Sequence, residues 1–503
     1  MWEGYYERCN HINRYMSPFD LTRLLFGDLI SLFLYINAAI IIVVIVFVKP
    51  RRVTSIYLWI AAFLLLPLIF VLIFYIFFGR DYHRQKLFKN KWVKDANVVK
   101  LLREQRKNLV LASESYVKSL HENVELARML INTNNSLITM DNEVRYINEG
   151  DEFFKVLFEE ISKAKRFVHM EMYIIRNDEL GKKLAHELTV KAKEGVEVKL
   201  LCDAVGCHKL PRRFFKELRE AGGKTAEYLP SWIRGINPRI NNRNHRKLLI
   251  VDGEMGICSG FNVGIEYTGR GRFGPWRDDA VVMRGGAAIT LEARFIQDWN
   301  FASKDDIMIT PYLPETDGRG KSPVQIVSGG PDTEHSPIKL HYVKMIASAT
   351  KKIYIQTPYF VPEESILAAL EMAAQSGVEV RLMIPCKPDH PFVFWASTFN
   401  AAYLLKSGVL VYKFNPGFIH AKICVIDDQV ASVGSANFDM RSFELNFETN
   451  AVIYDAELAK TIGEKFLRDV AEHSDQMTLK EYSARGTLVK LKEAVARLYT
   501  PIA

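Results

Sequence analysis

The residues of this chain best suited to catalysis are two histidines. Each is followed two residues later by a lysine and seven residues later by an aspartate. Each copy then leads into a turn of small residues that ends in an asparagine. A single His-x-Lys pair is usually a surface accident, whereas two copies in register indicate a duplicated domain that builds one site from two halves. The residues are His245, Lys247, Asp252 and Asn262 in the first copy, and His420, Lys422, Asp427 and Asn437 in the second.

This combination of side chains suits a phosphodiester substrate. Its cleavage needs a nucleophile, cations that neutralise the non-bridging oxygens, and a proton for the leaving alkoxide. The two histidines can supply the nucleophile and the acid, while the lysines and asparagines can hold the oxygens. A metal site would need further ligands, and a lysine two residues from each histidine repels a cation. We therefore expect phosphodiester chemistry without a metal or other cofactor.

The two aspartates fit this chemistry less well than the histidines and lysines. On a strand, residues two apart point to the same face, which brings each histidine and its lysine together. An odd separation of seven residues places Asp252 and Asp427 on the opposite face, and both also lie at turns. They belong to the repeated motif and stay among the catalytic candidates. The interpretation we favour is structural, with each carboxylate capping its turn or pairing with a buried cation.

The pattern of the soluble part predicts the elements that must position these residues. Runs typical of strands alternate with runs typical of helices from about residue 131 onward, which indicates an α/β fold with helices layered on a sheet. A polar stretch rich in proline and glycine, 311–323, separates the two copies. We expect two tandem α/β sandwich halves, 131–310 and 311–503, that share one active site, the second half ending in a C-terminal helix.

The N-terminal region predicts insertion into a membrane. Residues 29–48 and 56–78 are two uncharged runs, and at about 1.5 Å per residue each helix would be long enough to cross a bilayer core. A cleaved signal peptide is the weaker alternative, because a second apolar run follows at once and no Ala-x-Ala site ends the first. We expect a two-helix transmembrane hairpin within residues 1–78, followed by a basic juxtamembrane connector over residues 79–130.

Charge gives the expected orientation and limits the partners. More Lys and Arg residues lie before the first run and after the second than in the short loop between them, which favours a catalytic body on the cytoplasmic side. The formal net charge of +8 over 503 residues permits contact with anionic lipid or nucleic acid and proves neither. The six cysteines are scattered along the chain, which is typical of a protein in a reducing compartment.

An apolar stripe near the C-terminus has two interpretations. Leu488, Leu491, Val495 and Leu498 recur at the spacing of one helix face. Such a helix can pack against the rest of the protein or lie in the surface of a membrane. Packing is the more common use of such a stripe, and it is the interpretation that we favour here.

The repeated motifs carry a family resemblance. The segments 245–262 and 420–437 resemble the paired signature motifs of the phospholipase D superfamily. The two N-terminal apolar runs and the segments 275–278, 357–360 and 441–448 are similar to those of bacterial cardiolipin synthases in particular. The resemblance covers almost the whole chain from the first apolar run onward. One departure is Ser259, where the family usually has glycine, although Gly260 follows and keeps the turn flexible.

The resemblance implies a membrane-bound enzyme of the bacterial cell membrane that makes cardiolipin and glycerol from two phosphatidylglycerol molecules. By analogy His245 attacks the phosphorus and forms a phosphatidyl-histidine, while His420 protonates the departing glycerol and then deprotonates the second lipid. Lys247, Lys422, Asn262, Asn437 and Ser435 would bind the substrate, and Asp278 and Glu448 would orient the histidines. The implied partner is anionic phospholipid rather than nucleic acid, and the oligomeric state is open. Hydrolysis of phospholipid or nucleic-acid phosphodiesters is the alternative.

Overall fold

The computed structural model describes residues 18–43, 57, 60–61, 63–64, 120, 123–230, 242–271, 273–313, 320–333 and 335–499, without the side chains of 18–27 and 498–499. The chain divides into two compact units, the first containing residues 1–82 and the second residues 83–501. The predicted connector, 79–130, lies mostly outside the described residues. The two units are described separately below.

In the first unit the main element is helix α2 (Pro18–Val43). Several of its large apolar side chains are exposed, including Leu29, Leu32 and Phe33. Within the part of the chain that the structure describes, no helix combines the length and the apolar character needed to cross a membrane. The second predicted span, 56–78, and the last residues of the first lie almost entirely outside the described residues. The transmembrane hairpin therefore stays a prediction.

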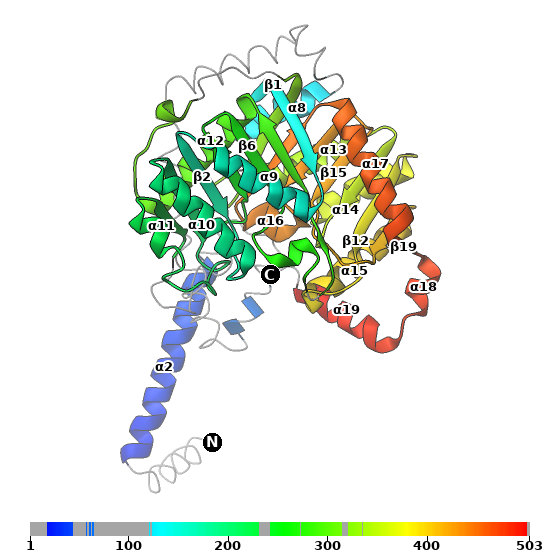
Figure 1. The fold of residues 1–503 in the computed structure, drawn as a ribbon. Helices are drawn as coiled ribbons and strands as arrows, with labels where there is room; N and C mark the ends of the chain where they lie inside the picture. Colours follow the sequence, from blue (N-terminus) through cyan, green and yellow to red (C-terminus); the bar gives the residue numbers. More distant parts are fainter. Residues whose placement is uncertain are drawn as a thin grey trace, which may run out of the picture. The chain divides into compact units, whose positions relative to one another are not determined.

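In the second unit most of the described strands form one extended sheet from the two copies of the repeat (Figure 1), and four short strands pair separately in two small sheets. The first copy contributes β1 (Ile138–Ile147), β2 (Phe167–Met172), β3 (Glu197–Asp203), β4 (Lys224–Tyr228), β5 (Leu248–Val251), β6 (Met255–Ser259), β7 (Trp276–Arg277) and β8 (Ala280–Arg284). The second contributes β9 (Ser322–Gly329), β10 (Lys352–Gln356), β11 (Phe360–Val361), β12 (Glu379–Pro385), β13 (Leu410–Phe414), β14 (Phe418–Ile419), β15 (Ile423–Ile426), β16 (Val430–Gly434), β17 (Phe438–Asp439), β18 (Glu448–Ile453) and β19 (Ser474–Met477).

The order of the strands shows the duplication directly. The sheet reads β19-β13-β12-β10-β15-β16-β18-β9-β1-β8-β6-β5-β2-β3-β4, with β9 and β1 paired antiparallel where the copies meet. Outward from that pair, β8-β6-β5-β2-β3-β4 in one copy matches β18-β16-β15-β10-β12-β13 in the other. The predicted tandem halves are confirmed, and they join edge to edge in a continuous sheet. The motif strands β5 and β15 occupy equivalent places in it.

Helices cover both faces of this sheet. On one face α12 (Gly286–Ser303) and α17 (Ala456–His473) pack into a shared core. On the other face, the first half is covered by α9 (Gly150–Lys163), α10 (Glu179–Lys193) and α11 (Lys216–Glu220). The second half is covered there by α8 (Val124–Asn134), α13 (Pro337–Ser348), α14 (Glu364–Gln375) and α15 (Pro391–Leu405). Because both faces are covered, most central strands are buried along their whole length, which explains their continuous apolar runs.

The remaining helices are short or lie at the C-terminal end. They are η5 (Ile265–Thr268), η6 (Thr310–Tyr312), α16 (Met440–Glu444), α18 (Leu479–Ala484) and α19 (Thr487–Tyr499). Helix α19 packs against α15 (Figure 1). Its Leu488, Leu491 and Val495 side chains are nevertheless exposed. The packing predicted for this apolar stripe is therefore wrong for these three residues, because α19 turns a different face towards α15.

Candidate active site

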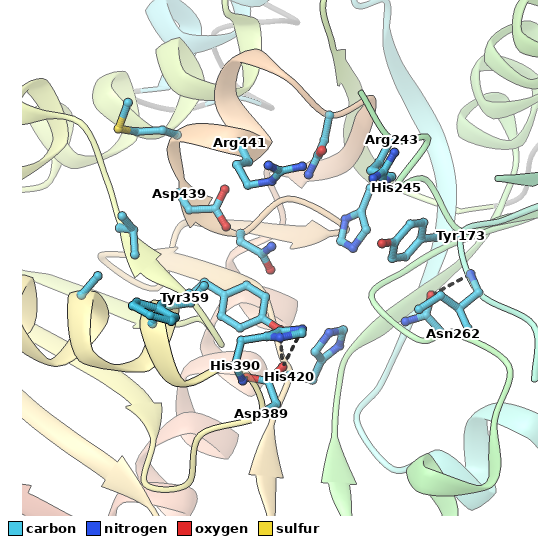
Figure 2. A pocket seen from close by; sticks show the side chains of 18 of the residues that line it. Tyr173, Arg243, His245, Asn262, Tyr359, Asp389, His390, His420, Asp439 and Arg441 are labelled. Carbon is cyan, nitrogen blue, oxygen red and sulfur yellow. Dashed lines mark hydrogen bonds and ion pairs between the residues drawn. The ribbon is translucent and has the colours of Figure 1, made fainter. Parts of the chain in front are cut away.

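The two repeated histidines lie at one cavity, although they come from different halves of the unit. The cavity has a volume of about 440 Å³, and Figure 2 shows both imidazole rings directed into it. Each histidine lies in an extended segment that leads into the equivalent strand, β5 or β15. Other lining residues include Tyr173, Arg243, Asn262, Trp276, Tyr359, Asn437 and Arg441. The duplication therefore builds one site from two halves, as the sequence predicts.

The surroundings of His245 fix the position of its ring proton. Its Nδ1 lies 2.9 Å from Glu448 Oε2 and 3.1 Å from the Ser435 carbonyl oxygen. Both of these partners are acceptors, so Nδ1 must carry the proton in the neutral imidazole. Burial, as the largest cause, lowers the pKa of His245 below its ordinary value. The ring is therefore neutral at physiological pH, with an unprotonated Nε2 that can act as a nucleophile.

The carboxylate that holds His245 is itself held at both oxygens. Glu448 begins β18 and accepts hydrogen bonds from Ser435 Oγ (2.6 Å), Ser442 Oγ (2.8 Å) and Asn446 Nδ2 (3.3 Å). Burial alone would raise the pKa of Glu448, but His245 and its neighbours outweigh burial and hold the pKa below its ordinary value. A charged carboxylate in a fixed position can orient the imidazole and stabilise a positive charge that forms on it.

His420 has a different set of partners. Its Nδ1 contacts Asp278 Oδ2, lies 2.7 Å from Lys422 Nζ, and is 3.3 Å from the Tyr267 hydroxyl. An acceptor and two potential donors meet at this nitrogen, so the proton of a neutral ring can reside on Nε2 instead. Burial first, and the charge of Lys422 next, lower the pKa of His420 to about 3. At that pKa the ring is neutral before substrate binds, and it becomes an acid only after it takes up a proton, which the Asp278 carboxylate beside Nδ1 stabilises.

A glycine gives Asp278 its place beside His420. A Cβ atom added at Gly260 would lie 2.0 Å from Asp278 Oδ1, so a larger residue would displace the carboxylate. The equivalent position in the second half is Ser435, whose hydroxyl donates to Glu448. The two acids are therefore held by different means in the two halves, one by close backbone approach and one by a side-chain hydrogen bond.

Each histidine is bound to the acid of the opposite half. The backbone N–H of His245 donates to the Phe447 carbonyl (2.9 Å), and that of His420 donates to the Arg277 carbonyl (2.7 Å). Strand β14, just before His420, pairs in parallel with β7. The structure thus brings the two predicted acids, Asp278 and Glu448, to the histidines, in a crossed pairing that the sequence did not predict.

The two lysines lie behind the histidines rather than on the cavity wall. Lys247 Nζ donates to the His245 carbonyl oxygen at 2.5 Å, and Lys422 Nζ donates to the His420 carbonyl oxygen and approaches Asp278 at 3.3 Å. Both are buried, and burial lowers the pKa of Lys247 to about 7. Neither lysine lines the cavity, and the binding of a phosphate oxygen by these lysines stays a prediction. Their charges instead lie directly beneath the histidines.

Of the three predicted substrate-binding polar residues, the structure places two at the cavity. Asn262 and Asn437 line it, and within the described part of the chain Asn437 Oδ1 is buried without a hydrogen-bond partner. Asn262 Nδ2 donates to the Tyr267 hydroxyl at 3.0 Å. Ser435 is different, because its hydroxyl donates to Glu448 and its carbonyl accepts from His245. We therefore correct the predicted role of Ser435 from binding substrate to holding the acid and the ring.

The two aspartates of the motif lie at the far ends of β5 and β15 from the histidines. Asp252 accepts hydrogen bonds from the backbone N–H groups of residues 165–167, and Asp427 from those of residues 350–352. Both have left-handed backbones, with φ of 55° and 52°. The structure supports the turn-capping interpretation. It corrects the inclusion of Asp252 and Asp427 among the catalytic candidates.

Comparison with known proteins places this geometry in a family. A family model described as "Cardiolipin synthase, PLD-like domain" matches residues 157–272 and 342–470. The major cardiolipin synthase of Bacillus subtilis (strain 168) is 44% identical over 94% of this chain and 98% of its own length. The chain belongs to the cardiolipin synthase family. A cardiolipin synthase of Staphylococcus aureus (strain N315) is 43% identical over 91% of this chain and 93% of its own length.

A solved structure supports the fold of this family member. The phosphatidylserine synthase of Haemophilus influenzae aligns with a TM-score of 0.58 over 75% of this chain and 98% of its own. The two sequences are 16% identical in that alignment. At so low an identity the likeness concerns the arrangement of helices and strands. It agrees with the sheet covered by helices on both faces that is described above.

Two cations of this cardiolipin synthase family member were missed by reasoning from sequence. Arg243 and Arg441 both line the cavity, and Figure 2 shows them on the His245 side. Arg243 lies two residues before His245, so the rule that put Lys247 on the same face of the extended segment could have identified it. Arg441 lies in the 441–448 segment, whose resemblance to the family alone indicates no role for this residue. Arginine is well suited to phosphate because its donors form a planar fork.

Proposed function

We propose that this protein is a membrane-bound phosphatidyl transferase that makes cardiolipin and glycerol from two phosphatidylglycerol molecules. The observation that carries the proposal is the pair of histidines at one cavity, each with a carboxylate at Nδ1, Glu448 for His245 and Asp278 for His420. Nδ1 of His245 lies between two acceptors, which leaves its Nε2 available to attack phosphorus and leaves the proton transfer to His420. The relatives that are named cardiolipin synthases, identical at 43 to 44%, support the substrate.

In the first step of the proposed mechanism, His245 Nε2 attacks the phosphorus of a phosphatidylglycerol. An N–P bond forms while the P–O bond to the terminal glycerol breaks, and His420 gives its proton to the departing oxygen. Arg243 and Arg441, with Asn262 and Asn437, line the space where the non-bridging oxygens would lie. The product of this step is a phosphatidyl-histidine.

In the second step, His420 removes a proton from the glycerol hydroxyl of a second phosphatidylglycerol. The oxygen attacks the same phosphorus, the N–P bond breaks, and cardiolipin leaves with His245 restored. The charge on the imidazolium is stabilised by Glu448, which lies 2.9 Å from Nδ1. Water in place of the second lipid would give phosphatidic acid, which is the hydrolytic alternative.

The test is to incubate the purified full-length protein with phosphatidylglycerol labelled in its terminal glycerol. We expect free glycerol and cardiolipin to appear in equal amounts, without added nucleotide or divalent ion, because the described cavity supplies the nucleophile, the acid and the cations. Mass spectrometry of the lipids and counting of released glycerol measure both products. Phosphatidic acid as the main product would favour the hydrolase, and a strict requirement for CTP would exclude the transferase mechanism.

We also propose that residues 1–78 hold the protein in the membrane with the catalytic unit in the cytoplasm. The exposed apolar side chains of α2 and the basic residues that flank the two apolar runs support this. The full-length protein should stay in the membrane pellet after alkaline carbonate extraction, and protease added outside spheroplasts should leave the catalytic unit uncut. Release by carbonate would contradict the hairpin, and cleavage from outside would contradict the orientation.

A further inference from the structure

The C-terminal helix α19 exposes an apolar face. Its Leu488, Leu491 and Val495 side chains are 65%, 59% and 41% exposed, and their spacing of three and four residues places them on one side of the helix. The other side is buried against the second half, where Glu493 accepts hydrogen bonds from Tyr482 and Arg485 and Ala496 packs near Val361. The helix is therefore fixed to the protein by one face while its apolar stripe faces outward.

Basic residues lie on the other faces of α19. Lys492 Nζ lies 5.2 Å from the centre of the Trp395 ring, and the Arg497 guanidinium lies 5.0 Å from the centre of the Phe399 ring. Lys490 on the same helix is exposed. Glu493, the one acid of α19, is buried and paired with Arg485. The outward surface of α19 thus combines leucine and valine with basic residues, which is the composition of helices that lie in an anionic lipid surface.

The same helix forms part of the wall of the active-site cavity. Ala496 lines the cavity together with Phe392, Val393 and Ala396 from α15. Phe392 is also exposed, so the apolar wall continues from the cavity to the outside at this point. A lipid that brings its phosphate to His245 and His420 must keep its acyl chains out of water. An apolar surface that continues into the cavity meets that need.

We propose that α19 and the N-terminal end of α15 dock on the surface of an anionic phospholipid bilayer and place the mouth of the cavity against the lipids. This inference rests on the proposed function for the identity of the substrate. The apolar stripe would lie among the upper acyl chains, and Lys490 and Lys492 would lie among the phosphates. A phosphatidylglycerol could then enter from the bilayer without leaving it completely.

The docking is tested with a fluorescent probe on Leu491→Cys in the full-length protein, reconstituted in vesicles of phosphatidylglycerol and phosphatidylcholine. Lys155→Cys, on the exposed side of α9, is the matched control, and the labelled parent protein gives the background from native cysteines. We expect nitroxide-bearing lipids to quench the probe at 491 while aqueous iodide does not, and the reverse at 155. Quenching by iodide at 491 would overturn the proposal, and protection from both quenchers would show that another protein surface covers α19.

A double variant tests whether the docking serves catalysis. We expect Leu488→Glu with Leu491→Glu to lower the rate on vesicles of long-chain phosphatidylglycerol by about tenfold or more, with a change below about twofold on a water-soluble short-chain phosphatidylglycerol. Met308→Glu, which replaces an exposed apolar residue in the first half, is the control and should affect neither rate. Equal losses on both substrates would overturn a docking role. If no cardiolipin forms from either substrate while lipids quench the probe, the transferase proposal fails and the docking stands.

Discussion

Replacing His245 with alanine is expected to lower kcat for glycerol release by about 10⁴-fold or more, because the atom that forms the bond to phosphorus is removed. Rapid quenching of the unsubstituted enzyme in neutral denaturant during turnover should trap the phosphatidyl group on His245, because the N–P bond is labile in acid. The bound phosphatidyl group is located by mass spectrometry of peptides from the quenched protein. His245→Ala should give no labelled peptide, and label on His420 in the unsubstituted enzyme would reverse the assignment of the two roles.

Two further variants, His420→Ala and Asp252→Asn, compare the loss of the second catalytic histidine with the loss of a turn-capping carboxylate. His420→Ala removes the acid of the first step and the base of the second, so both steps should slow, by about 10²- to 10⁴-fold for proton transfer. Asp252→Asn leaves the cavity untouched and removes an acceptor of backbone N–H groups at the turn after β5. It should reduce the free energy of unfolding by about 1 to 3 kcal/mol and leave kcat of the folded enzyme nearly unchanged. Equal loss of kcat in both variants would contradict the separation of catalytic and turn-capping residues.

The repeat made the main features of the fold and site predictable. Two copies of His-x-Lys in register predict two equivalent strands, and β5 and β15 occupy equivalent places on either side of the β1–β9 pair. The two-residue periodicity of a strand separates Asp252 and Asp427 from the histidines. Those predictions depend on local geometry and on the duplication. Both are visible in the sequence alone.

The remaining features depend on contacts between residues distant in sequence. The crossed pairing of His245 with Glu448 follows from the hydrogen bond of its N–H to the Phe447 carbonyl, and no pattern near either residue indicates which half supplies the acid. Ser435 was assigned to the substrate because it follows the motif, yet its hydroxyl turns to Glu448. The stripe on α19 was predicted to pack because a periodic pattern cannot tell which face of a helix is covered.

The crossed pairing gives the second prediction of large effect. Glu448→Gln should lower the rate of phosphatidyl-enzyme formation by about 10²- to 10⁴-fold, because a neutral amide no longer stabilises the charge on His245 or fixes its Nδ1 proton. Asp278→Asn should act on His420 instead. It should slow both glycerol release and transfer to the second lipid, because His420 is the acid of the first step and the base of the second. Rapid quenching in neutral denaturant with phosphatidylglycerol labelled in its phosphate measures the two steps separately.

A same-half pairing predicts the opposite outcome, since Asp278 would then control the nucleophile and Glu448 the acid. Glu444→Gln, an exposed carboxylate of α16 four residues before Glu448, is the matched control and should keep the rate of the parent enzyme. The double variant His245→Ala, Glu448→Gln should be no slower than His245→Ala alone, because Glu448 acts through the ring that has been removed. A further large loss in that double variant would show that Glu448 contributes to the reaction by a route other than His245, and the crossed pair would then not explain its role.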